Sequence, residues 1–95
     1  MAERKPEQRK VAVITGGSKG IGLALARVFA QAGYAIVITG RDTNRLQKTA
    51  NELGKEHGSI TALACDVRDP GSVRQLFAEI GQRHSSIDVL INNAG

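Results

Sequence analysis

Short, continuous apolar runs alternate along the chain with longer segments whose apolar residues recur at helical spacing. The apolar runs span residues 10–15, 35–39, 59–64 and 89–92. The helical segments between them span residues 19–32, 43–57 and 70–84. Continuous apolar runs are typical of parallel strands that are covered on both faces. The sequence therefore predicts an α/β fold in the order βαβαβαβ, with right-handed crossovers between the strands.

Residues at the ends of the helical segments predict where each helix begins and stops. Gly33 is a C-terminal stop for the first helix, and Asp42 and Asp69 are N-caps for the second and third. In each helix we expect one apolar stripe to pack into the core. The stripe residues are Ile21, Leu25, Val28 and Phe29 in the first helix, Leu46, Ala50 and Leu53 in the second, and Val73, Leu76, Phe77 and Ile80 in the third.

The charge pattern gives little support to nucleic-acid binding. The first ten residues contain four basic and two acidic side chains, so half of the formal net charge of +4 lies there. The other basic residues form no stripe, and aromatic residues are only 3% of the chain. We expect residues 1–9 to form a flexible charged tail, and we expect no nucleic-acid partner.

Targeting and metal-binding signals are weak in this sequence. No apolar run is long enough to span a bilayer, and the charged N-terminus does not resemble a secretory signal. Cys65 is the only cysteine, which excludes an internal disulfide and favours a cytoplasmic location. His57 and His84 have no nearby cluster of metal ligands. We therefore expect neither membrane association nor a metal site.

The segment Thr15-Gly16-Gly17-Ser18-Lys19-Gly20-Ile21-Gly22 joins the first predicted strand to the first predicted helix. Gly16 can adopt the positive φ of a tight turn, Gly20 lets an anion approach the backbone, and Gly22 lets the helix pack closely on the strand. The helix N-terminus then offers N–H groups to a phosphate. No Gly-Lys-Ser or Gly-Lys-Thr follows, so the segment is not a P-loop.

Three segments of the chain together resemble the classical short-chain dehydrogenases/reductases. The family pattern Thr-Gly-x-x-x-Gly-x-Gly is present at residues 15–22, and Asn-Asn-Ala-Gly is present at residues 92–95. The pair Asp66-Val67 follows the third strand, as in the family's adenine-contacting segment. The resemblance runs from about Val11 to the end of the chain. It implies a Rossmann-type doubly wound parallel sheet, with residues 10–95 forming its N-terminal half in strand order 3-2-1-4.

The resemblance also implies roles for individual residues in binding a dinucleotide. Asp66 would accept a hydrogen bond from the adenine amino group, and the Val67 N–H would donate one to a ring nitrogen. Asn92 would tie the sheet together and bring its backbone to the cofactor ribose, while Ala94 and Gly95 are small because the cofactor passes over them. The pyrophosphate and the adenosine ribose would be lined by Gly16, Gly17, Ser18, Lys19, Gly20, Ile21 and Gly22.

The end of the second strand favours NADP(H) as the cofactor. Enzymes of this architecture that use NAD commonly place an acid there for the ribose 2′-hydroxyl, whereas this chain has Gly40 followed by Arg41. Arg41 can donate two hydrogen bonds to a 2′-phosphate, and Lys19 can approach the same group. An alternative remains in which Asp42, one place later, acts as the acid.

The catalytic residues of the family have no counterpart in these 95 residues. The family uses a Ser and a Tyr-x-x-x-Lys arrangement, but the only tyrosine here is Tyr34 and Ile38 stands four places after it. Those residues would lie beyond Gly95. We therefore predict the cofactor-binding portion of an oxidoreductase that transfers hydride to or from a carbonyl or alcohol substrate, inactive by itself; the resemblance implies that the complete protein is a homo-oligomer. The alternatives are a non-catalytic dinucleotide-binding module and, third, a methyltransferase.

Overall fold

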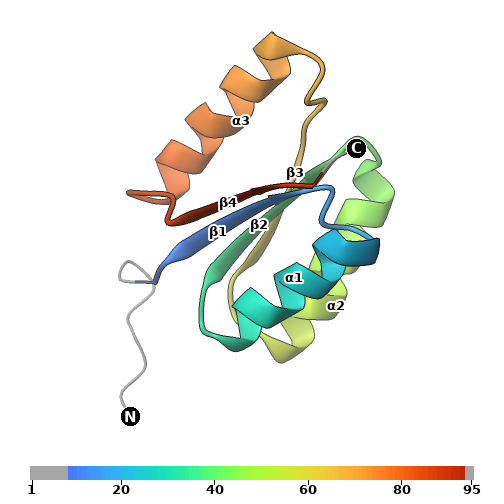
Figure 1. Ribbon diagram of the computed structural model, residues 1–95, viewed down its shortest axis with the longest axis vertical. Helices are drawn as coiled ribbons and strands as arrows, with labels where there is room; N and C mark the ends of the chain where they lie inside the picture. Colours follow the sequence, from blue (N-terminus) through green and yellow to red (C-terminus); the bar gives the residue numbers. More distant parts are fainter. Residues whose placement is uncertain (1–8, 94–95) are drawn as a thin grey trace.

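A computed structural model describes residues 9–93 as a four-stranded sheet with helices on both faces (Figure 1). The strands are β1 (Val11–Thr15), β2 (Ala35–Gly40), β3 (Ile60–Ala64) and β4 (Val89–Asn92). The helices are α1 (Gly20–Gln31), α2 (Thr43–Glu56) and α3 (Pro70–Arg83). Each element begins and ends within one residue of its predicted bounds, so the local sequence signals identified all seven elements.

The strands pair in the order β3-β2-β1-β4, and every pair is parallel. In the register, Thr15 at the end of β1 lies beside Thr39 of β2 and Asn92 of β4. Gly40 at the end of β2 lies beside Ala64 of β3. The predicted order 3-2-1-4 is therefore confirmed, and the carboxyl ends of all four strands meet at one edge of the sheet.

The two faces of the sheet have separate cores. Helices α1 and α2 cover one face and α3 covers the other (Figure 1). Under α1 and α2 the core contains Ile14, Ile36, Ile38 and Leu46, each almost completely buried. Under α3 it contains the alternate residues of the same strands with Leu76 and Ile80 of the helix. The continuous apolar runs of β1 and β2 are needed because both of their faces are covered.

The predicted apolar stripe of α1 is wrong at two positions. Ile21 and Val28 are 72% and 59% exposed, and the residues that α1 buries are Gly22, Ala26 and Ala30. These small residues recur every four positions, so they form a narrow face that lets the helix backbone lie close to the sheet. The larger apolar residues of α1 also recur at helical spacing. The prediction therefore assigned the buried face to them and not to the small residues.

The predicted helix ends are confirmed. The Asp42 carboxylate accepts a hydrogen bond of 3.0 Å from the Arg45 backbone N–H, and Asp69 accepts one of 2.9 Å from Gly71. Gly33 ends α1 with a φ of 91°, a conformation that favours glycine. The Asp42 cap fixes where the loop from β2 ends and α2 begins. That loop carries Arg41 to the carboxyl edge of the sheet.

Candidate functional site

A cleft of about 770 Å³ lies at the carboxyl ends of β1, β2 and β3. Ligands of open α/β sheets bind at this edge, where the helices on the two faces diverge. The cleft is lined by residues from the loops that follow three strands and from the end of β4. These residues are Gly16, Ser18, Lys19, Gly20, Ile21, Thr39, Gly40, Arg41, Asp42, Arg45, Cys65, Asp66, Val67, Arg68 and Asn93.

Eight of the residues that the sequence analysis proposed for the cofactor line this cleft. They are Gly16, Ser18, Lys19, Gly20, Ile21, Arg41, Asp66 and Val67. Gly17, Gly22 and Asn92 do not line it; the two glycines pack closely on neighbouring segments, and Asn92 contacts Thr15 of β1. The remaining two, Ala94 and Gly95, lie outside the described residues.

The loop between β1 and α1 is tied to three other elements. The Gly16 N–H donates to the Thr39 carbonyl oxygen of β2 at 2.8 Å. The Asn93 side-chain amide donates to the Gly16 carbonyl at 3.4 Å, and the Thr49 hydroxyl of α2 donates to the Ser18 carbonyl at 3.4 Å. Gly16 and Gly20 have φ values of 68° and 60°, which side chains rarely permit. The loop therefore has a defined shape that depends on these two glycines.

Two further glycines of the loop are required by close packing. A Cβ atom on Gly22 would lie 2.3 Å from the Gly16 carbonyl oxygen and 2.7 Å from Asn93 Nδ2. A Cβ atom on Gly17 would lie 2.6 Å from Ile38 Cγ2. The prediction that Gly22 lets the helix approach the strand is thus refined, since Gly22 contacts the loop and Asn93, and Gly17 contacts the strand.

The N-terminus of α1 differs from those of the other two described helices. Lys19 occupies the N-cap position and its side chain caps no backbone N–H, whereas Asp42 and Asp69 cap α2 and α3. None of the three described helices has an acidic residue in its first turn, so the missing side-chain cap is what distinguishes α1. Its unpaired N–H groups and the positive end of its dipole therefore favour an anion at Gly20 and Ile21, which line the cleft.

The charged side chains of the cleft are mainly basic. Arg68 is paired with Asp66, and Arg45 Nε lies 3.9 Å from Asp42 Oδ2. Within residues 9–93, the side chains of Lys19 and Arg41 have no hydrogen-bond or ion-pair partner. These two cations consequently leave positive charge in the cleft that an anionic group of a ligand can neutralise.

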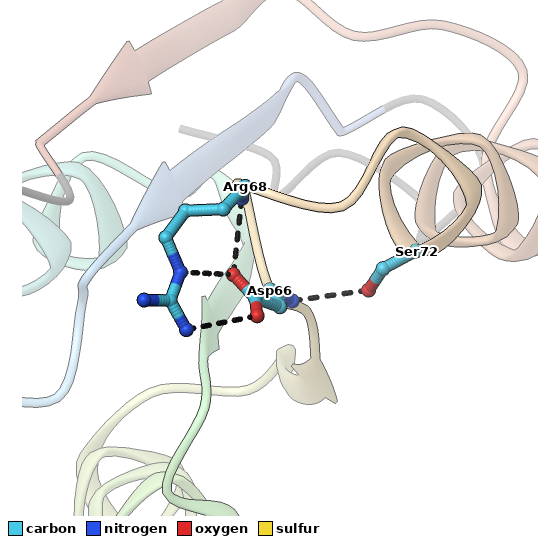
Figure 2. Close-up of polar contacts among 3 residues, drawn as sticks. All are labelled: Asp66, Arg68 and Ser72. Carbon is cyan, nitrogen blue, oxygen red and sulfur yellow. Dashed lines mark hydrogen bonds and ion pairs between the residues drawn. The ribbon is translucent and has the colours of Figure 1, made fainter.

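Asp66 is held in place by two neighbours from its own loop and from α3 (Figure 2). Its carboxylate accepts three hydrogen bonds from Arg68, and its backbone N–H donates to the Ser72 hydroxyl at 3.0 Å. The side-chain hydrogen bond from Arg68 lowers the pKa of Asp66 below its ordinary value, and the charge of Arg41 adds to this effect. This ion pair stabilises the folded chain above the ordinary pKa of aspartate, and the stabilisation is lost as the pH falls through the lower folded-state pKa.

The end of β4 is joined to β1 through the Thr15 hydroxyl. That hydroxyl lies 3.1 Å from Asn92 Oδ1 and 3.3 Å from the Ile91 carbonyl, and it accepts a 2.9 Å hydrogen bond from the Asn93 N–H. The structure therefore places Asn92 where it ties two strands together. On β2, the hydroxyl of Thr39 is buried beside the cleft and has no partner within residues 9–93.

Several residues of the cleft were missed by the sequence analysis as site residues, and the main ones are Thr39, Arg45, Arg68 and Asn93. Arg45 lies in the first turn of α2, close in sequence to Arg41 and Asp42, and this nearness to the end of β2 could have indicated that it lies beside the cleft. Arg68 lies two positions after Asp66, within reach of a local carboxylate contact. No sequence signal connects Asn93 with Gly16, because that contact depends on how β4 pairs with β1.

Residues 9–93 contain neither a membrane-spanning helix nor a cluster of metal ligands. None of their helices is both long enough and apolar enough to cross a membrane. The same residues contain no cluster of three or more His, Cys, Asp or Glu side chains that could hold a metal ion.

The parallel sheet in order 3-2-1-4, with a glycine loop between β1 and α1, defines a Rossmann-type α/β protein. The chain belongs to the short chain dehydrogenase family, whose sequence model matches residues 10–95. This membership argues against the methyltransferase alternative.

Individual relatives support the family assignment. The chain is 46% identical over 99 residues to dehydrogenase/reductase SDR family member 7B of Danio rerio, covering 97% of this chain and 32% of that protein. It is 41% identical over 88 residues to 1-deoxy-11-beta-hydroxypentalenate dehydrogenase of Streptomyces arenae, covering 93% and 31%. The crystal structure of L-sorbose reductase from Gluconobacter frateurii, complexed with NADPH and L-sorbose, superposes with a TM-score of 0.88 at 41% identity, covering 92% and 34%. The chain thus spans about a third of the length of these relatives.

Proposed function

We propose that this chain is the cofactor-binding portion of an NADP(H)-dependent short-chain oxidoreductase that acts on a carbonyl or alcohol substrate. The observation that carries the proposal is a pair of cleft cations, Lys19 and Arg41, beside a strand end that has Gly40 in place of an acid. Neither cation has a hydrogen-bond or ion-pair partner among residues 9–93. Two positive charges and no acid at Gly40 suit a 2′-phosphate better than a free hydroxyl. The L-sorbose reductase structure, which contains NADPH, supports the same cofactor.

The residues around the cleft fit each part of this cofactor. The uncapped first turn of α1 and the open backbone at Gly20, where a Cβ atom would meet nothing within 4 Å, suit the pyrophosphate. Asp66 and the Val67 N–H suit the edge of the adenine ring. The buried hydroxyl of Thr39 lacks a partner in residues 9–93, so a ligand or an ordered water could satisfy it. We assign the Asn92 backbone to the cofactor ribose, and we propose that Ala94 and Gly95 are small because the cofactor passes over them.

NADPH, when bound, supplies a hydride equivalent to the carbonyl carbon of the substrate. The residues of this chain would bind and orient the dinucleotide, but a proton donor for the carbonyl oxygen is also required. Tyr34, His57 and His84 each lie between the end of a helix and the start of the next strand. They are therefore at the amino edge of the parallel sheet, opposite the cleft. We propose that residues 1–95 alone bind the cofactor without turnover.

The first test of this function compares NADPH with NADH as ligands of the purified 95-residue chain. NADPH is expected to bind weakly but about 10- to 100-fold more tightly than NADH, because charged hydrogen bonds to the 2′-phosphate contribute roughly 1.5–3 kcal/mol each. Titration followed by the fluorescence of the reduced nicotinamide measures both affinities. Equal affinities, or a tighter complex with NADH, would contradict the proposed cofactor.

The second test measures oxidation of NADPH by the same chain in the presence of carbonyl compounds. We expect no substrate-dependent loss of absorbance at the wavelength of the reduced nicotinamide, since these 95 residues contain no Tyr-x-x-x-Lys arrangement and Tyr34, His57 and His84 lie at the opposite edge of the sheet. A family enzyme that has the Tyr-x-x-x-Lys arrangement serves as the positive control. Carbonyl-dependent oxidation by the pure chain would show that these residues include catalytic groups.

A further inference from the structure

Arg68 lines the cleft and contacts Asp66 through both its backbone and its side chain. The Arg68 backbone N–H donates to Asp66 Oδ1 at 3.0 Å, and Arg68 Nε donates to the same oxygen at 3.1 Å. Arg68 Nη2 donates to Oδ2 at 3.2 Å. Figure 2 shows the guanidinium turned back onto the carboxylate while Ser72 lies on the opposite side of Asp66. The carboxylate is therefore held by a planar fork together with a backbone donor.

The number of hydrogen bonds determines what Asp66 can still accept. An ionised carboxylate has about four acceptor positions, two on each oxygen. Oδ1 already accepts two hydrogen bonds and Oδ2 accepts one, all of them from Arg68. The Ser72 hydroxyl accepts a hydrogen bond from the Asp66 backbone N–H and makes none to the carboxylate. Asp66 is thus left with one acceptor position, on Oδ2, for a ligand in the cleft.

We propose that Arg68 is a positioning residue that fixes the Asp66 carboxylate so that Oδ2 alone accepts a hydrogen bond from the ligand, and that this selects a base with an exocyclic amino group. The inference rests on the proposed function, in which Asp66 lies at the edge of the adenine ring. Hypoxanthine carries an oxygen at the same place, and that oxygen would face a second acceptor.

The chemistry of the contact supports a positioning role for Arg68. A guanidinium binds the two carboxylate oxygens with a geometry that restricts rotation of the carboxylate, whereas a lysine ammonium acts as a point charge. Arg68 and Arg41 both hold the pKa of Asp66 below its ordinary value, so the group is an ionised acceptor at neutral pH. No charged side chain of α3 takes part in these contacts, because Ser72 is the residue of that helix that bonds to Asp66.

The test compares NADPH with its hypoxanthine analogue, nicotinamide hypoxanthine dinucleotide phosphate, as ligands of the 95-residue chain. The unmodified chain is expected to prefer NADPH at least tenfold, because the hypoxanthine oxygen faces the Asp66 carboxylate and its protonated N1 can no longer accept from an N–H such as that of Val67. In Arg68→Ala the preference should fall about fivefold from its value in the unmodified chain, and Arg68→Lys should restore it only in part. The control is Arg74→Ala, an exposed arginine of α3 that does not line the cleft and should keep the preference of the unmodified chain.

A double-mutant cycle with Asp66→Asn separates positioning from a general structural effect. If Arg68 acts through the Asp66 carboxylate, adding Arg68→Ala to Asp66→Asn should leave the adenine-to-hypoxanthine ratio unchanged. A merely loosened loop would weaken both ligands equally, and a thermal melt of each variant verifies that it is folded.

Three outcomes would overturn the inference. An unchanged preference in folded Arg68→Ala would show that Asp66 needs no positioning by Arg68. A stronger preference would show that Arg68 competes with the base for the carboxylate. Failure of the unmodified chain to bind NADPH at all would overturn the proposed function together with this inference. Normal NADPH binding with either of the first two results would overturn the inference alone.

Discussion

Gly22→Ala is expected to abolish NADPH binding and to lower the free energy of unfolding by about 1–3 kcal/mol, the usual cost of overpacking. The added methyl group would lie 2.3 Å from the Gly16 carbonyl oxygen and 2.7 Å from Asn93 Nδ2. Gly16 cannot move aside easily, because its N–H is bonded to Thr39 of the central sheet. The loop would have to leave the position in which it faces the cleft. Chemical unfolding and titration with NADPH measure the two effects.

Gly54→Ala is the matched control for this substitution. Gly54 lies inside α2, and a Cβ atom there would meet nothing within 4 Å. Replacing a helical glycine by alanine commonly stabilises a helix by about 0.5–1 kcal/mol, so this variant should be slightly more stable and should bind NADPH normally. Unimpaired NADPH binding by Gly22→Ala would mean that the loop can shift without losing its function.

The double substitution Gly40→Asp/Arg41→Ala is expected to reverse the cofactor preference from NADPH to NADH. The new carboxylate would stand at the end of β2, where it can accept from a ribose 2′-hydroxyl and repel a 2′-phosphate. A Cβ atom fits at Gly40, because it would lie 3.6 Å from Leu46 Cδ2, an ordinary contact distance. Removing Arg41 also eliminates a cleft cation that has no partner in the described part of the chain. We expect the ratio of the two affinities to change by about 100-fold or more.

Gly40→Ala controls for the bulk of the added side chain without its charge. This variant should keep the preference for NADPH, and Arg41→Ala alone should reduce the preference without weakening NADH. Parallel titrations of the four proteins with both cofactors separate steric from electrostatic effects. If the double variant still preferred NADPH, the 2′-phosphate would have to lie away from the end of β2.

The element order of this protein could be predicted because it depends on local signals. Continuous apolar runs, the caps Asp42 and Asp69, and the stop at Gly33 each act over a few neighbouring residues. The strand order followed from the resemblance to the family and was confirmed. Parallel strands bring their carboxyl ends to one edge, so most of the proposed cofactor residues were also predictable as neighbours in space.

Only the tertiary structure determined which distant segments are in contact and which face of α1 is turned toward the sheet. The burial of Gly22, Ala26 and Ala30 in place of Ile21 and Val28 depends on how closely α1 approaches the sheet, which helical periodicity does not encode. The contact of Asn93 with the glycine loop forms only after β4 has paired with β1. The contact between the Arg68 guanidinium and the Asp66 carboxylate depends on the rotamer of the Arg68 side chain. The sequence by itself therefore determined the elements and the edge at which the cleft forms, because those follow from short-range patterns and parallel pairing. The packed structure determined which side chains converge there, because that depends on distances across the sheet.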